Sequence, residues 1–348
     1  MAEYTKKIRV GNKYIGGGSD ILIQSMCNTD TRNVKATVEQ IKKLEEAGCE
    51  IIRVAVLDNE AASAIKEIKK QINIPIVADI HFDYRLAIAS IESGVDKIRI
   101  NPGNIGSIEN IKKVIEKAKE YEIPIRVGVN GGSLAKDVLN KYGKVTVEGL
   151  VESAYSNVEI LENMDFDNMV VSLKVSNVPM TIEAYNLLAK KCNYPLHIGV
   201  TEAGTLVGGT IKNSLGIGIL LSQGIGDTLR VSLTADPVEE VKVGWQILKG
   251  MGLRKRGIDF TSCPTCGRTK VNMFPIAEKV ERALENVDKN IKVAVMGCAV
   301  NGPGEAAEAD FGVACGDNCG LLFKKGEIVK KVDEEEIVEA LLELIHNS

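Results

Sequence analysis

Apolar and polar residues follow two alternating patterns over roughly the first 235 residues of the chain. Short runs rich in β-branched residues are each followed by a polar loop, and then by a longer segment whose apolar residues recur every three or four positions. The short runs predict strands at 21–26, 50–56, 74–80, 96–100, 123–129, 168–174, 195–200 and 227–233. Eight strands alternating with helices, about 30 residues apart, favour a closed (β/α)8 TIM barrel over an open doubly wound sheet.

The pattern changes near residues 254–257, where a basic, glycine-containing joint precedes the sequence SCPTCGR. The rest of the chain predicts a small α+β module. Its expected elements are a helix at 273–287, a buried strand at 291–297, a hairpin around 321–332 and a closing helix at 334–346. We therefore expect a substrate-binding barrel domain over residues 1–255 and a second domain over residues 256–348.

Composition and charge narrow the class of protein. The chain has 348 residues, of which 45% are hydrophobic and 26% charged, with a net charge of -4. This is typical of a globular protein and gives no overall positive field for nucleic acid. Neither a signal peptide nor a membrane-spanning run is visible, so we expect a cytoplasmic protein with no membrane partner. Its eight cysteines are then better interpreted as core residues or metal ligands than as disulfides.

Several predicted barrel strands contain a cation within an apolar run. These cations are Arg53, Arg99, Arg126, Lys174 and Arg230, whereas only Asp79 and Glu202 supply acids at the same strand ends. A buried charge needs a partner, and barrel active sites lie at the C-terminal strand ends. The surplus of cations predicts an anionic ligand, best a phosphorylated or diphosphorylated small molecule. Buried ion pairs inside the barrel are the alternative interpretation.

Other polar residues near these strand ends are more ambiguous. Asn101 and Asn130 begin loops, where they either bind a ligand or simply form turns. His81 and His197 are either catalytic or packing residues, and packing is the preferred interpretation for His197.

The second domain contains a cysteine cluster. Cys263 and Cys266 form a C-x-x-C turn, and Cys298 ends a buried strand before a glycine-proline loop that carries Glu305. Three thiolates with one carboxylate suit an iron-sulfur cluster that has a labile iron. Zinc is the rival, with Cys315 or Cys319 as a fourth ligand. The spacing alone leaves the choice open.

Together these motifs resemble one family, the bacterial 4-hydroxy-3-methylbut-2-enyl diphosphate synthases of the non-mevalonate isoprenoid pathway. The resemblance covers essentially the whole chain, and the motifs that carry it are IQSM, ADIHF, KIRINPGN, RVGVN, VSLKVSN, GVTEAG, CPTCGR and GCAVNGPGEA. It implies a TIM barrel followed by a [4Fe-4S] domain similar to those of sulfite and nitrite reductases. It also implies an oxidoreductase that opens and reductively dehydrates 2-C-methyl-D-erythritol 2,4-cyclodiphosphate with two electrons.

The resemblance also implies roles for individual residues. The implied cluster ligands are Cys263, Cys266, Cys298 and Glu305. The implied substrate-binding residues are Arg53, Arg99, Asn101, Arg126, Asn130, Lys174, Arg230 and Ser232. Asp79 and Glu202 correspond to active-site acids, with Glu202 the better candidate for proton transfer, and Glu305 is expected to take part in catalysis as an exchangeable ligand. The implied partners are reduced flavodoxin or ferredoxin, and a second subunit whose cluster domain caps the barrel.

One feature departs from the family pattern. Cys315 and Cys319 stand where the family usually has no thiols, and we interpret them as bystanders. The competing functional hypothesis is a non-redox barrel enzyme of the pterin-binding type with a zinc-stabilised C-terminal interaction module.

Overall fold

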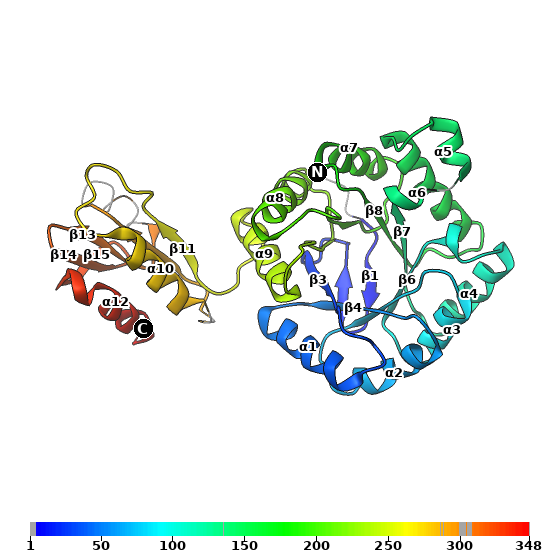
Figure 1. Cartoon of the computed structure of the whole chain (residues 1–348), viewed down its shortest axis with the longest axis horizontal. Helices are drawn as coiled ribbons and strands as arrows, with labels where there is room; N and C mark the ends of the chain where they lie inside the picture. The colour runs from blue at the N-terminus through cyan, green and yellow to red at the C-terminus, as the bar shows by residue number, and fades with distance from the viewer. Residues whose placement is uncertain are drawn as a thin grey trace. The chain divides into compact units, whose positions relative to one another are not determined.

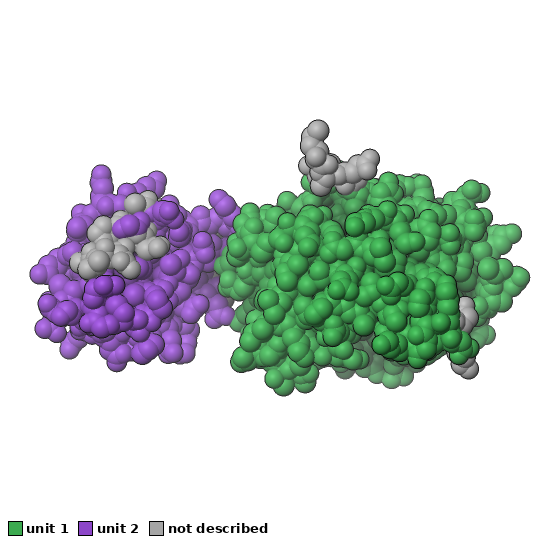
Figure 2. Space-filling model, turned by 90° about the horizontal axis from the view of Figure 1, so that it is seen from above, with its two compact units in different colours: residues 1–254 green, residues 255–348 purple. Residues whose placement is uncertain are grey.

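The computed structural model describes residues 5–134, 136–285, 287, 289–298, 304 and 308–347. The chain forms two compact units, Met1–Arg254 and Lys255–Ser348, which are coloured green and purple in Figure 2. Each unit has its own hydrophobic core, as expected of separate domains.

The first unit is a barrel of eight parallel strands (Figure 1). The strands are β3 (Leu22–Met26), β4 (Ile51–Ala55), β5 (Ile76–Asp79), β6 (Lys97–Ile100), β7 (Ile125–Asn130), β8 (Met169–Lys174), β9 (His197–Ile198) and β10 (Thr228–Leu229). They pair in the order β8-β7-β6-β5-β4-β3-β10-β9. The ring closes where Val171 bridges Leu196 in parallel and the Val171 N–H donates to the Pro195 carbonyl at 2.9 Å. The predicted barrel is thus confirmed over the open sheet.

Helices surround this barrel, and apolar residues of most of them pack against the strands in one core. They are α1 (Val34–Ala47), α2 (Asn59–Lys69), α3 (Tyr84–Glu92), α4 (Ile108–Glu120), α5 (Lys136–Tyr142), α6 (Val147–Glu162), α7 (Val178–Ala189), α8 (Leu206–Ser222) and α9 (Pro237–Gly250). Short 3-10 turns, η1 (Pro102–Asn104) and η2 (Gly131–Ser133), follow β6 and β7. Polar caps start the helices: Asp58, for example, accepts a hydrogen bond from the Ala61 N–H at 2.9 Å. In the described part of the chain, no helix is long and apolar enough to cross a membrane.

An N-terminal hairpin closes one end of the barrel. Its strands, β1 (Ile8–Val10) and β2 (Lys13–Ile15), pair antiparallel and were not among the predicted strands. Their apolar side chains form a small core with four strand residues, and the members of this core are Ile8, Val10, Ile15, Leu22, Ile51, Val77 and Val170. Because side chains alternate along a strand, the next interior positions toward the other end belong to polar residues such as Gln24, Arg53 and Asp79. The interior is apolar at the plugged end and polar at the C-terminal strand ends.

The second unit is a five-stranded mixed sheet with two helices. Its strands are β11 (Asp259–Ser262), β12 (Lys292–Met296), β13 (Phe311–Gly316), β14 (Cys319–Lys324) and β15 (Glu327–Asp333). They pair in that order, with β11, β12 and β13 parallel and the other pairs antiparallel. The helices α10 (Met273–Leu284) and α12 (Ile337–His346), the second preceded by η3 (Glu334–Glu336), contribute to one core with the sheet. The predicted α+β module is confirmed, whereas its likeness to sulfite and nitrite reductases stays a prediction.

Candidate active site

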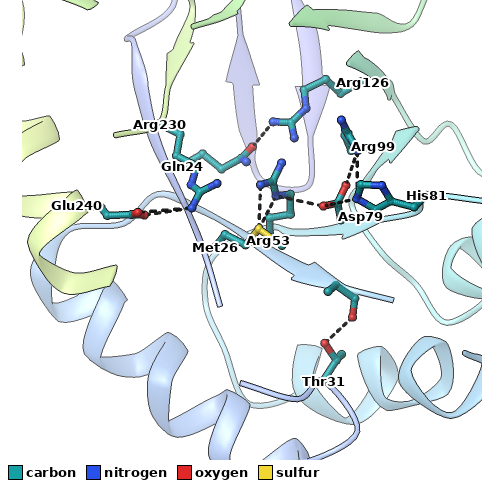
Figure 3. A network of polar contacts seen from close by, with 11 residues as sticks. Gln24, Met26, Thr31, Arg53, Asp79, His81, Arg99, Arg126, Arg230 and Glu240 are labelled. Carbon is teal, nitrogen blue, oxygen red and sulfur yellow. Dashed lines mark hydrogen bonds and ion pairs between the residues drawn. The ribbon is translucent and has the colours of Figure 1, made fainter. Parts of the chain in front are cut away.

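Basic side chains gather in the polar half of the barrel interior (Figure 3). The five cations picked out in the sequence all lie on interior positions of β4, β6, β7 and β8 or just after β10. The side chains of Arg53 and Arg99 are only 8% and 7% exposed, and Arg230 is 19% exposed. Lys97, two residues before Arg99 on the same face of β6, is a sixth basic residue in this interior and was not among the predicted site residues.

Asp79 lies between two of these guanidinium groups. Its Oδ1 is 3.3 Å from Arg99 Nη1, and its Oδ2 is 3.8 Å from Arg53 Nε and 3.5 Å from His81 Nε2. Burial alone would raise the pKa of Asp79, but Arg53, His81 and Arg99 together hold that pKa well below its usual value. Asp79 is therefore ionised at neutral pH and holds the two arginines in place.

Arg53 is held on two sides. Its guanidinium donates to the Met26 sulfur from Nε at 3.1 Å and from Nη2 at 2.8 Å, and it faces Asp79 on the other side. Burial lowers the pKa of Arg53 to about 10, with Arg230 and Arg99 acting in the same direction and Asp79 opposing them. The neighbouring cations thus repel one another, and an anion bound between them would reduce this repulsion.

The positive charge of Arg126 is compensated less by neighbouring groups than that of Arg53. Nη1 donates to Gln24 Oε1 at 3.3 Å, while the buried Nε finds no hydrogen-bond partner among the described residues. Burial lowers the pKa of Arg126 well below its usual value, and Arg53 and Arg99 lower it further. Arg99 packs closely over Gly128, where a Cβ would lie 2.8 Å from Arg99 Nε.

Glu240 is a site residue that our sequence reasoning missed. It lies on α9, is 5% exposed, and its carboxylate is within 3.4 Å of Arg230 Nη2. It also accepts a hydrogen bond from the Leu233 N–H at 2.9 Å. Its burial could have been predicted from the sequence, because it stands beside Val241 on the helix face that also contains Gly244 and Trp245.

Ion pairs therefore account for part of the cation cluster, as the alternative interpretation held. Arg53 and Arg99 share Asp79, and Arg230 has Glu240. Within the described ranges, however, no carboxylate pairs with Lys97, Arg126 or Lys174, all of them buried. Burial lowers the pKa of Lys174, and the neighbouring arginines reinforce this effect. The interior has the uncompensated positive charge that an anion site needs.

The remaining predicted barrel residues lie around these cations with different exposure. Glu202 follows β9, is exposed, and has a left-handed backbone with φ of 52°, which is unusual for a non-glycine residue. Asn101 is buried and its Oδ1 accepts from the Gly103 N–H at 3.2 Å, the turn-forming role considered above. Asn130 ends β7 and is half-buried. The backbone of Ser232 is held by the side chain of Asn213, while the Ser232 side chain is half-buried.

His81 and His197 also differ in their exposure to solvent. His81 is half-exposed beside Asp79 and Arg99, with Nε2 3.3 Å from Arg99 Nη1. His197 is fully buried on β9, and its Nδ1 lies 2.8 Å from Thr228 Oγ1. Burial and nearby cations lower its pKa well below the usual value, so His197 is neutral in the barrel.

The predicted thiol ligands lie at one edge of the C-terminal sheet. β11 and β12 are parallel neighbours, and Cys263 and Cys298 follow their C-terminal ends. The Cys263 N–H donates to the Val295 carbonyl at 3.0 Å. Cys266 lies on an exposed turn that Thr269 closes, and Gly297 packs against Thr269. None of the eight cysteines, all in the described part of the chain, forms a disulfide.

Two further facts bear on the ligand set. Glu305 lies outside the described residues. Among those that are described, no three Cys, His, Asp or Glu side chains converge closely enough to hold a single metal ion.

Cys315 and Cys319 lie on β13 and β14. Cys315 is fully buried in the core of the C-terminal unit, where burial raises the pKa of its thiol to about 12. Cys319 is half-buried and opposite Gly316. The packing of Cys315 is that of a core residue.

Comparison with known protein families shows to which family this chain is related. Residues 5–245 match the GcpE TIM-barrel domain and residues 259–347 match the GcpE protein C-terminal domain. The chain belongs to the GcpE family. The resemblance drawn from the motifs is thereby confirmed.

Curated members of the GcpE family match nearly from end to end. A protein from Caldanaerobacter subterraneus subsp. tengcongensis is 64% identical over 99% of this chain and 97% of its own length. One from Ruminiclostridium cellulolyticum is 62% identical over 98% and 97%. One from Geobacter sulfurreducens is 56% identical over 98% and 97%. All three are named 4-hydroxy-3-methylbut-2-en-1-yl diphosphate synthase (flavodoxin).

Solved structures outside the GcpE family share the barrel alone. An N-acetylneuraminic acid synthetase from Leptospira borgpetersenii matches with a TM-score of 0.50 and 14% identity, over 72% of this chain and 92% of that one. A dihydropteroate synthase from Coxiella burnetii matches with a TM-score of 0.50 and 11% identity, over 71% and 97%. At such low identity the likeness shows the fold and does not favour the pterin-type hypothesis.

Proposed function

We propose that this chain converts 2-C-methyl-D-erythritol 2,4-cyclodiphosphate to (E)-4-hydroxy-3-methylbut-2-enyl diphosphate in the non-mevalonate isoprenoid pathway. The observation that carries the proposal is a cluster of five buried or nearly buried cations in a barrel whose full-length relatives are named for this synthase. A cyclic diphosphate supplies the negative charge that these cations lack. The reaction takes up two electrons and one proton, opens the ring and releases one water.

The diphosphate is assigned to the cations that face the barrel interior. Arginine suits this task because its planar guanidinium binds two phosphate oxygens at once. The binding residues we assign are Arg53, Arg99, Arg126, Lys174 and Arg230, with Asn101, Asn130 and Ser232 beside them. Arg126 and Lys174 have no carboxylate partner in the described ranges, so they gain most from a bound phosphate.

The two acids have different roles in this proposal. Asp79 is held ionised by the arginines around it, so it is a poor proton donor and serves to position Arg53 and Arg99. Glu202 is exposed at the end of β9, and its left-handed backbone points to a residue held for function. We therefore assign proton transfer at the substrate hydroxyl to Glu202. His81, beside Asp79 and Arg99, is a further group within reach of a ligand in the barrel mouth.

The C-terminal unit is proposed to hold a [4Fe-4S] cluster. Cys263, Cys266 and Cys298 share one sheet edge and are not tied up in disulfides, which fits a cluster that binds each thiolate at a different iron. Glu305 completes the proposed ligand set from outside the described residues. When bound, the cluster would supply the two electrons, received one at a time from reduced flavodoxin or ferredoxin. The cytoplasmic location expected from the sequence stays a prediction.

We also propose that the protein is a homodimer. α8 presents an unusual exposed apolar stripe for a barrel helix, and its members are Leu206, Val207, Ile211, Leu215 and Ile219, between 38% and 73% exposed. A stripe of this kind marks an interaction site. Because α8 carries only one charged residue, Lys212, its surface suits the same surface of a second copy, as a two-fold dimer requires.

The test uses the full chain purified without oxygen. We expect a brown protein with broad absorption near about 400 nm, and turnover of the cyclodiphosphate with reduced flavodoxin. A colourless protein with one zinc per chain and no turnover would instead support the pterin-type barrel with a zinc module. Glu305→Ala is expected to lose turnover and to make the cluster fragile without unfolding the barrel.

A further inference from the structure

Lys97 is a buried basic residue that begins the KIRINPGN motif but is absent from the proposed binding set. It pairs with Val77 across the β5–β6 ladder, whereas Arg99, two residues later, pairs with Asp79. Lys97 therefore lies one interior level deeper than Arg99, next to the apolar core to which Val77 belongs. Its side chain is completely buried, and Nζ finds no hydrogen-bond partner anywhere in the described ranges.

The surroundings of this amine are basic. Charged and titratable side chains face the interior from the other strands: Arg53 on β4, Asp79 on β5, Arg126 on β7, Lys174 on β8, His197 on β9 and Arg230 after β10. Asp79 is engaged by Arg53 and Arg99, and Arg230 by Glu240. Burial lowers the pKa of Lys97 well below its usual value, and Arg126 and Arg53 lower it further.

An unpartnered ammonium in this position costs free energy, which a neutral amine avoids. A diphosphate bound to Arg53 and Arg126 would change this balance, because it cancels the charges that repel a proton at Lys97. The anion would also attract the proton directly across the low-dielectric interior.

We propose that Lys97 is a positioning residue whose amine is neutral in the free barrel and takes up one proton when a diphosphate binds beside Arg53 and Arg126. This inference rests on the proposed function, because it takes the cyclodiphosphate as the ligand. Ring opening adds one negative charge to the bound anion, so the same proton would be held more firmly beside the product. A leucine or methionine at this position would fill the space but could not take up a proton when the anion binds.

Calorimetric titration of the full chain with 2-C-methyl-D-erythritol 2,4-cyclodiphosphate, without reductant, tests this directly. The cyclic diester has no phosphate group that titrates near neutral pH, so proton uptake reports on the protein. Titrations in two buffers of different ionisation heat, from pH 7 to 9, give the number of protons taken up. We expect the wild-type Kd to rise by up to about tenfold per pH unit, the slope for one linked proton.

Lys97→Met is the decisive variant, because methionine keeps the length of the side chain without its amine. We expect it to bind more weakly at pH 7 and to take up one proton fewer than the wild type. Lys112→Met, at an exposed lysine on α4, is the matched control and should behave as the wild type does.

Three results would overturn the inference. Wild-type binding without proton uptake would reject it even if Lys97→Met failed to fold. Equal uptake by the wild type and Lys97→Met would reject the assignment to Lys97 while leaving the proposed function intact. Absence of cyclodiphosphate binding to the wild type would reject the proposed substrate, and the role of Lys97 with it.

Discussion

Glu240 on α9 holds the guanidinium of Arg230 at the mouth of the barrel, with Nη2 3.4 Å from Oε2 and 3.5 Å from Oε1. The same carboxylate accepts the Leu233 N–H, so it fixes both the arginine and the chain that follows β10. Because Glu240 is buried, it also offsets part of the positive charge in the barrel. One side chain outside the strands therefore organises the last strand end of the site.

Glu240→Gln should destabilise the free protein by about 2–3 kcal/mol, because it removes the charge that compensates a largely buried arginine. Chemical denaturation measures this change, and Glu239→Gln, at a partly exposed glutamate of the same helix, is the control, expected within about 0.5 kcal/mol of the wild type. Bound cyclodiphosphate should restore more stability to Glu240→Gln than to the wild type. Equal destabilisation by the two variants would contradict this account of Glu240.

Asp79→Asn tests the ionised acid between Arg53 and Arg99. The pKa of Asp79 is lowered on folding, so its contribution to stability is fully present above about pH 4 and is lost as the pH falls below that value. We expect Asp79→Asn to be less stable than the wild type by about 1.5–3 kcal/mol at pH 7. The difference should shrink between about pH 4 and pH 2. Denaturant unfolding across this range checks the sign, with exposed Asp20→Asn as the control.

Strand periodicity predicted all eight barrel strands, although β9 and β10 contain only two ladder residues each. It could not locate the β1–β2 hairpin, because strands of three residues carry too little pattern to be recognised. In the second unit β12 and the β14–β15 hairpin were predictable, whereas β11 and β13 were not. β11 lacks buried residues, which removes the alternation that marks a strand.

Most residues of the candidate site could be predicted from the sequence, but the contacts between them could not. Lys97 stands two residues before Arg99, so the strand period alone places it on the same interior face. The pairing of Arg230 with Glu240 depends on how α9 packs on the barrel, which no local pattern reveals. The different roles proposed for Asp79 and Glu202 likewise depend on their burial, because Asp79 is buried and Glu202 is exposed.

Cys266→Ser should lose the iron-sulfur absorption and the turnover, because it removes one of the three thiolates at the sheet edge. The thermal unfolding of the barrel unit should be unchanged, since Cys266 is exposed on a turn of the other unit. Iron analysis of anaerobically purified protein provides the measurement. Cys319→Ser is the control and should keep its iron, and iron loss in that variant would reassign Cys319 as a ligand.

Leu215→Lys should convert the proposed dimer to a monomer by placing a charge at the middle of the exposed stripe on α8. Light scattering after size-exclusion chromatography over a range of concentrations measures the mass. Leu57→Lys, at a residue that is 75% exposed outside this stripe, should leave the mass unchanged. A wild-type protein that is monomeric at every concentration would contradict the dimer, and a dimeric Leu215→Lys would contradict this choice of surface.

Arg126→Met separates stability from binding at one position. Arg126 is 1% exposed, and its charge is opposed by burial and by Arg53 and Arg99. Removing that charge should raise the free energy of unfolding by about 1 kcal/mol or more, as when buried charges give way to apolar side chains of similar size. Cyclodiphosphate binding should weaken by about 1.5–3 kcal/mol, the scale of a hydrogen bond to a charged group. Arg85→Met, at an exposed arginine on α3, should leave binding unchanged. A more stable protein that binds less ligand would identify Arg126 as a residue kept for its ligand at the expense of the fold, whereas a less stable protein with normal affinity would mean that Arg126 serves the fold alone.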